Sequence, residues 1–175
     1  HIGYAKSIGI SCGTPAAVAT NTQAAKPVEA PKPINVAQYP NRKALVIGNA
    51  NYLNQTPLKN PINDARAVAA KLEEVGFTVT YKEDLGRRDF IRTIDRFKED
   101  LSGSDISVFY YAGHGIEIDK QNYLIPVDAV LDSMAVAKYD TILLDDAVEA
   151  SINTDKLAMV LIDACRDNPF LAAMK

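Results

Sequence analysis

Short strand-like runs alternate with amphipathic helical stretches from Arg42 onward, and this alternation constrains the fold more than any other feature of the sequence. The strand-like runs lie at 43–48, 77–85, 105–112 and 157–164; residues 116–128 suggest a hairpin; helical spacing of apolar residues marks 60–77, 87–103 and 144–152. Asn63 or Asp64 is expected to cap the first helix, and Gly76 to end it. The alternation predicts an α/β domain at 42–175, with a mostly parallel sheet flanked by helices on both faces.

The first part of the chain has a different composition. Residues 13–40 are rich in Ala, Pro and Thr and show no sustained periodicity, so we expect 1–41 to be a flexible segment or the end of a pro-region. The chain starts at His1 rather than Met, which indicates a processed, tagged or truncated product.

Overall composition excludes several classes of protein. The 175 residues are 47% hydrophobic, which supports one domain with a proper core. A net charge of -3 without a basic stripe argues against nucleic-acid binding, and no apolar run approaches the roughly 18 residues that span a bilayer. Two cysteines, Cys12 and Cys165, are too few for a disulfide framework, and with two histidines a structural zinc site is not expected. An intact thiolate favours a reducing compartment, so the cytoplasm is the default location, with an exported form left open.

His114 stands between two glycines directly after one apolar run, and Cys165 follows another. In open α/β sheets, ligands and chemistry gather beyond the carboxyl ends of the strands. Neighbouring strands are about 4.8 Å apart, so residues at their ends can touch. This favours a nucleophilic Cys165 with His114 as general acid and base. The alternative is an ordinary buried cysteine and a turn histidine.

Both segments carry a family resemblance. "YYAGHGIE" and "LIDACRDNPF", with a separation of 165 − 114 = 51 residues, resemble the caspase-like cysteine peptidases, in particular the bacterial orthocaspases and their metacaspase and paracaspase relatives. The resemblance covers about residues 42 to 170. It implies a caspase–haemoglobinase fold and peptide-bond hydrolysis through a thioester. Cys165 would attack the carbonyl, His114 would protonate the leaving amine, and the backbone N–H groups of Gly115 and Cys165 would hold the oxyanion. The flanking glycines would let the main chain approach the substrate.

The resemblance also implies a specificity. Where caspases have Q-A-C-R-G, this chain has Asp163 two positions before the cysteine, an acid that lines the primary pocket in metacaspases and paracaspases. A second pocket acid in those families belongs to an "NDA" element, matched here by Asp64. Two carboxylates in one pocket favour Arg or Lys before the cleaved bond. The alternative for Asp64 is a plain helix-start residue.

The same resemblance suggests cofactors and partners. Asp145 and Asp146 stand where metacaspases carry part of a calcium site, but no full ligand set is evident, so we expect no required cofactor and leave calcium activation open. A small subunit from the same precursor is expected to complete the sheet, with self-processing after Lys175 as its origin or an arbitrary chain end as the alternative. A homodimer is left open.

Three other functions fit the sequence less well. A catalytically silent caspase-like adaptor would be favoured by loss of the cysteine or the histidine, and both are present. A thiol phosphatase would need the pattern Cys-x5-Arg, but the residue at the arginine position is Leu171. A dinucleotide-binding domain would need a glycine fingerprint that "GNANYLNQ" does not supply.

Overall fold

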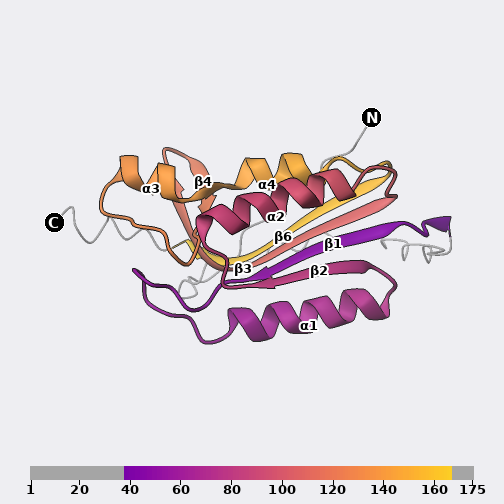
Figure 1. Ribbon diagram of the computed structural model, residues 1–175, viewed down its shortest axis with the longest axis horizontal. Helices are drawn as coiled ribbons and strands as arrows, with labels where there is room; N and C mark the ends of the chain where they lie inside the picture. The colour runs from indigo at the N-terminus through magenta and orange to yellow at the C-terminus, as the bar shows by residue number, and fades with distance from the viewer. Residues whose placement is uncertain (1–37, 167–175) are drawn as a thin grey trace, which may run out of the picture. The chain divides into compact units, whose positions relative to one another are not determined.

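The structure is a computed structural model that describes residues 38–166. The elements in chain order are β1 (Arg42–Gly48), α1 (Pro61–Glu74), β2 (Thr78–Glu83), α2 (Arg87–Asp100), β3 (Ile106–Ile118), β4 (Gln121–Leu124), α3 (Met134–Asp140), β5 (Ile142–Leu143), α4 (Leu144–Ser151) and β6 (Leu157–Arg166). Figure 1 shows α1 on one face of the sheet and α2 with α4 on the other. The predicted strands, hairpin and three helices are therefore present, and helices cover both faces.

The sheet is mixed, with a parallel core and an antiparallel extension. Strand β3 pairs in parallel with β1 and with β6, and β1 pairs in parallel with β2. Strand β1 stops at Gly48, opposite Ala112, whereas β3 continues and pairs antiparallel with β4. Because Gly115 aligns with both Leu124 of β4 and Arg166 of β6, β4 and β6 lie on opposite edges of β3. Strand β4 therefore occupies the edge that β1 leaves.

The period of two along the strands fills a core on each face of the sheet. Ala44, Val46, Val108 and Tyr110 pack with α1 residues such as Ala65. Leu45, Ile47, Phe109 and Tyr111 point the other way and pack with α2 residues such as Phe90. Burial on both faces explains why β1 and the first half of β3 are near-continuous apolar runs in the sequence.

Helix α1 begins earlier than the sequence suggested. Its N-terminal flanking residue is Asn60, Pro61 is the first helical residue, and neither Asn63 nor Asp64 caps the helix. The prediction was wrong because it overlooked Pro61, whose fixed φ and missing N–H suit the first helical position. Asp64 lies in the first turn and is exposed. The helix ends near Gly76 as expected, where the chain takes a positive φ of 84°.

Two short elements were not predicted. Helix α3 is capped by Ser133, whose side-chain oxygen accepts a hydrogen bond from the N–H of Val136 at 3.3 Å, and the two-residue strand β5 follows it. Ser133 is a recognisable capping signal, but seven- and two-residue elements carry too little periodicity to detect. No helix in the described part of the chain is long and apolar enough to cross a membrane.

Leu45 provides a test of the core on the α2 face. Its side chain is 0% exposed, whereas that of Leu53 is 75% exposed. We expect Leu45→Ala to lower the free energy of unfolding by about 2–5 kcal/mol, because it removes buried methyl groups and leaves a cavity. The matched substitution Leu53→Ala should change it by about 0.5 kcal/mol or less. Urea denaturation measures both values, and equal effects would contradict the assigned core.

Candidate active site

Strands β3 and β6 bring the two predicted reactive residues together. They pair in parallel, and the backbone register aligns His114 with Cys165. The prediction that the two strands are neighbours is confirmed, but both residues lie within their strands rather than past their ends. They do lie beyond the end of β1, which stops opposite Ala112. The loop that leaves β1 therefore passes beside His114.

The imidazole of His114 is held by that loop. Its Nε2 lies 2.8 Å from the backbone carbonyl oxygen of Thr56. A carbonyl can only accept, so Nε2 carries the hydrogen and Nδ1 is the ring nitrogen that can take a proton. The ring of Tyr52 packs against the imidazole, with centroids 4.6 Å apart and planes tilted by 52°. The Thr56 carbonyl therefore favours the Nε2–H tautomer, and the Tyr52 ring packs against one face of the imidazole.

Two buried tyrosines fix the main chain of His114. The N–H of His114 donates to Tyr52 Oη at 2.7 Å, and Tyr111 Oη donates to the carbonyl oxygens of His114 at 2.8 Å and Ile125 at 3.0 Å. The two hydroxyls are 3.2 Å apart, and Tyr52 is the donor because the proton of Tyr111 points to the carbonyls. Burial raises the pKa of Tyr52 to about 12 and that of Tyr111 well above its ordinary value. Both side chains are thus neutral scaffold groups near neutral pH.

Gly113 is required by this tyrosine pair. A Cβ at this position would lie 2.5 Å from Tyr111 Oη and 2.6 Å from Tyr52 Oη, far inside normal contact distance. From the sequence, the glycines beside His114 are expected to allow close approach of the substrate to the main chain. For Gly113 the structure gives a different reason, which is the close approach of the two hydroxyls. Gly115 is buried within β3, and its proposed oxyanion contact stays a prediction.

The two acids of the predicted specificity pocket lie on the same side of the sheet. Tyr110 Oη donates to Asp163 Oδ2 at 3.3 Å. The pKa of Tyr110 is raised to about 12, first by burial, then by the charge and hydrogen bond of Asp163, and further by the charge of Asp64. Both carboxylates are therefore close enough to act on one hydroxyl, and both are exposed.

The remaining predicted residues are placed less informatively. Asp145 and Asp146 lie exposed in the first turn of α4. Burial raises the pKa of Asp146, and the charges of Glu149 and Asp145 add to the rise. Within residues 38–166 no group of three or more His, Cys, Asp or Glu side chains could hold a metal ion. Lys175 and most of segment 1–41 lie outside the described residues.

Sequence reasoning missed Tyr52, Tyr111 and Thr56. Tyr111 was recognised only as part of an apolar strand, although its hydroxyl needs a buried partner. Thr56 contributes a backbone carbonyl, which any residue type possesses, so no sequence signal marks it. Tyr52 stands in a polar loop where nothing in the local pattern indicates burial.

A cysteine and a histidine are aligned on neighbouring parallel strands of an α/β sheet, which is the arrangement expected from the resemblance to caspase-like cysteine peptidases. The caspase-domain family model matches residues 41–174, and the chain belongs to this family.

Curated proteins are similar to parts of this chain. It is 35% identical over 86 residues to the human mucosa-associated lymphoid tissue lymphoma translocation protein 1, covering 49% of this chain and 10% of that protein. It is 28% identical over 130 residues to mouse caspase-1, covering 71% of this chain and 31% of that protein. The chain thus matches less than a third of the length of these curated relatives.

A solved structure supports the fold. Protein GSU0716 from Geobacter sulfurreducens superposes with a TM-score of 0.57 at 21% identity, covering 77% of this chain and 54% of that one. At this identity the likeness concerns the fold alone. It agrees with the α/β architecture expected from the sequence.

Gly113→Ala tests the packing beneath His114. We expect it to lower the free energy of unfolding by about 1–3 kcal/mol, because the added methyl group displaces the hydroxyls of Tyr52 and Tyr111. In a Tyr52→Phe background the cost should be smaller, since one of the two hydroxyls is gone. Urea denaturation of the four chains of this cycle measures the coupling. Strict additivity would show that the predicted clash does not occur.

Proposed function

We propose that this chain is the catalytic part of a cysteine endopeptidase that cleaves after Arg or Lys through a Cys165–His114 dyad. The observation that carries the proposal is the alignment of the two residues on β3 and β6, with the imidazole tautomer fixed by the Thr56 carbonyl. Membership of the caspase-domain family supports peptidase chemistry at the level of the superfamily.

In the proposed reaction, Nδ1 of His114 takes the thiol proton and the sulfur of Cys165 attacks the substrate carbonyl. The backbone N–H groups of Gly115 and Cys165 stabilise the oxyanion. As the tetrahedral intermediate collapses, the C–N bond breaks and the imidazolium protonates the leaving amine, which leaves a thioester. Water, deprotonated by His114, then hydrolyses the thioester and releases the thiol.

The same proposal assigns Asp64 and Asp163 to binding of the substrate cation. Two contacts support this assignment: Asp163 accepts a hydrogen bond from Tyr110, and Ala65, the neighbour of Asp64 on α1, packs in the same core cluster as Tyr110. A guanidinium could bond a carboxylate in a bidentate way, whereas an ammonium acts as a point charge. Lys175 is a residue type that such a pocket would accept, so we extend the proposal to self-processing after Lys175, with the released small subunit remaining associated.

The second candidate is a catalytically silent adaptor that works by assembly. Both functions predict a folded caspase domain, so turnover separates them. The informative assay is a fluorogenic peptide panel with Arg, Lys or Asp before the scissile bond, measured with and without calcium. Cleavage of none of these peptides by the processed protein would favour the adaptor.

Cys165→Ala and His114→Ala are each expected to reduce peptidase activity at least about 10³-fold, because nucleophile and base act as a unit. The chain provides matched controls, since it contains one other cysteine and one other histidine. Cys12→Ala and His1→Ala should leave kcat within about twofold. Rates on the arginine peptide measure all four variants. Substantial turnover by Cys165→Ala would contradict the dyad, and intact-mass analysis of the same variant, expressed with its downstream residues, would test self-processing.

Asp163→Asn is expected to lower kcat/KM for arginine and lysine peptides roughly tenfold, since a hydrogen bond to a charged group is worth about 1.5–3 kcal/mol. The exposed acid Asp89 on α2 supplies the control, and Asp89→Asn should change the same ratio less than about twofold. Activity on an aspartate peptide should not fall. If Asp163→Asn lost activity equally on all peptides, Asp163 would support the active site generally and not the cation pocket.

A further inference from the structure

Residues 49–58, the first part of the connection between β1 and α1, form a loop with two residues that contact His114. Tyr52 packs on the imidazole and accepts the backbone N–H of His114, and the Thr56 carbonyl accepts from Nε2. Thr56 is exposed, so the position of its carbonyl depends on how the loop is anchored. The loop closes on itself at Ala50, whose carbonyl accepts the N–H of Leu58 at 2.9 Å. Ala50 and Asn51 therefore hold the closed base of the loop. Its middle is held separately by the N–H of Leu53, which donates to the Val127 carbonyl, and by the side chain of Asn54, which donates to the carbonyls of Asp128 and Ala129.

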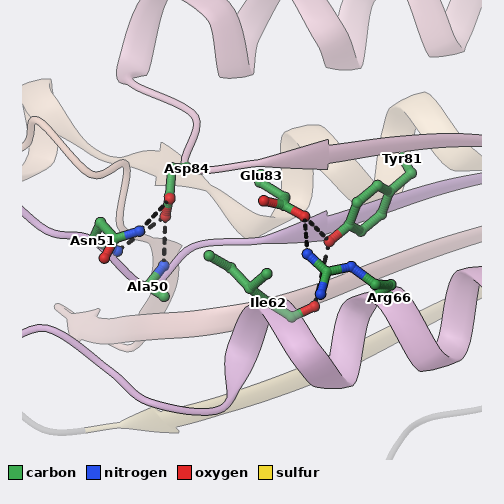
Figure 2. Close-up of polar contacts among 7 residues, drawn as sticks. All are labelled: Ala50, Asn51, Ile62, Arg66, Tyr81, Glu83 and Asp84. Atoms are coloured by element: carbon green, nitrogen blue, oxygen red, sulfur yellow. Dashed lines mark hydrogen bonds and ion pairs between the residues drawn. The ribbon is translucent and has the colours of Figure 1, made fainter.

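Asp84, directly after β2, holds this base of the loop. Its Oδ1 accepts the backbone N–H groups of Ala50 at 2.8 Å and Asn51 at 3.0 Å, and its Oδ2 accepts the side-chain amide of Asn51 at 2.6 Å. Figure 2 shows these three bonds converging on one carboxylate. Asn51 directly precedes Tyr52, so the carboxylate acts one residue away from the ring that packs on His114.

The backbone at Asp84 supports a specific role. Its φ of 49° lies in the left-handed region, which is unfavourable for a residue with a Cβ but tolerated by Asp. Its own N–H donates to the carbonyl of Gly48 at 2.9 Å, which ties the end of β2 to the end of β1. Burial raises the pKa of the Asp84 carboxyl, but the hydrogen bonds from Asn51 and Ala50 outweigh it, and the pKa lies below its usual value. The side chain is thus a carboxylate at neutral pH, as three donors require.

We propose that Asp84 is a positioning residue for His114, acting through Ala50 and Asn51 to hold the Tyr52 ring and the Thr56 carbonyl against the imidazole. The part of the inference that concerns catalysis rests on the proposed function. The part that concerns the imidazole tautomer does not.

The neighbouring acid Glu83 provides an internal comparison. It accepts from Arg66 Nη2 at 2.8 Å and from Tyr81 Oη at 2.5 Å, so it links β2 to α1. Figure 2 shows the two clusters side by side on the same segment of chain. Two adjacent carboxylates therefore serve different partners, and only the contacts of Asp84 lead into the 49–58 loop.

The test uses NMR of the full chain with ¹⁵N-labelled histidine rings, at a pH where the imidazole is neutral. The chain has only two histidines, so a His1→Gln background leaves His114 as the single signal. The unmodified site should show the Nε2–H tautomer as the dominant form. Asp84→Gly removes all three of these hydrogen bonds while accommodating the positive φ, and it should shift the ring signals toward a mixture of tautomers. Asp84→Asn keeps an oxygen for the two backbone donors and should restore the dominant tautomer.

Two further variants control for general loosening. Glu83→Ala should leave the tautomer unchanged, although it removes a carboxylate one residue away. Asn51→Ala deletes only the side-chain donor, so it should shift the tautomer in the same direction as Asp84→Gly but less. If Asp84→Gly does not fold, Asn51→Ala takes its place in the test. A tautomer unchanged in both Asp84→Gly and Asn51→Ala, or shifted equally by Glu83→Ala, would overturn the inference.

Kinetics separate this inference from the proposed function. On the arginine peptide, Asp84→Gly should lower kcat roughly tenfold to a hundredfold with KM changed less than about twofold, because the loop orients the base and does not bind substrate. A change in KM alone would overturn the positioning role. Absence of turnover in the processed protein without substitutions, combined with the predicted tautomer shift, would refute the proposed function and leave the positioning role of Asp84 intact.

Discussion

The parallel pairing of β3 with both β1 and β6 is the constraint on which the site depends. Pairing with β6 aligns His114 with Cys165, and pairing with β1 ends two residues before His114. Because β1 stops there, its continuing chain turns past His114 and places Tyr52 and Thr56 on the imidazole. Strand β6 thus places Cys165 beside His114, and the loop that follows β1 supplies the residues that contact the imidazole.

Within residues 38–166, the groups that contact His114 directly are neutral side chains and backbone atoms. Tyr52 and Tyr111 form a directed chain of hydrogen bonds that begins at the His114 N–H and ends on carbonyl oxygens. Such a network is stable only when each member is satisfied, since an unpaired buried hydroxyl or N–H costs about 1–3 kcal/mol. The fold therefore fixes the backbone of His114 with the same groups that complete its core, and Gly113 is the residue that leaves room for them.

The sequence predicted the parts of the fold that depend on periodicity. The near-continuous apolar runs of β1 and β3, and the placement of His114 and Cys165 on neighbouring strands, followed from these signals. Asp84 and Thr56 could not be predicted in the same way. Asp84 follows β2 and bonds the loop that follows β1, whereas Thr56 contacts His114 through its backbone carbonyl. The start of α1 at Pro61 was detectable, and the error arose from favouring polar capping residues over a proline at the first helical position.

Within residues 38–166, Asp64 and Asp163 are both exposed, which limits the free energy with which they could bind a substrate cation. An ion pair between exposed groups is worth about 0–1 kcal/mol, which is at most about a fivefold preference. A strict preference for Arg or Lys needs a hydrogen-bonded pair shielded from water, worth about 1.5–3 kcal/mol for each bond. Within residues 38–166, the only side-chain hydrogen bond of either acid is the one that Asp163 accepts from Tyr110 at 3.3 Å. We infer that strong specificity requires a further wall over these two acids.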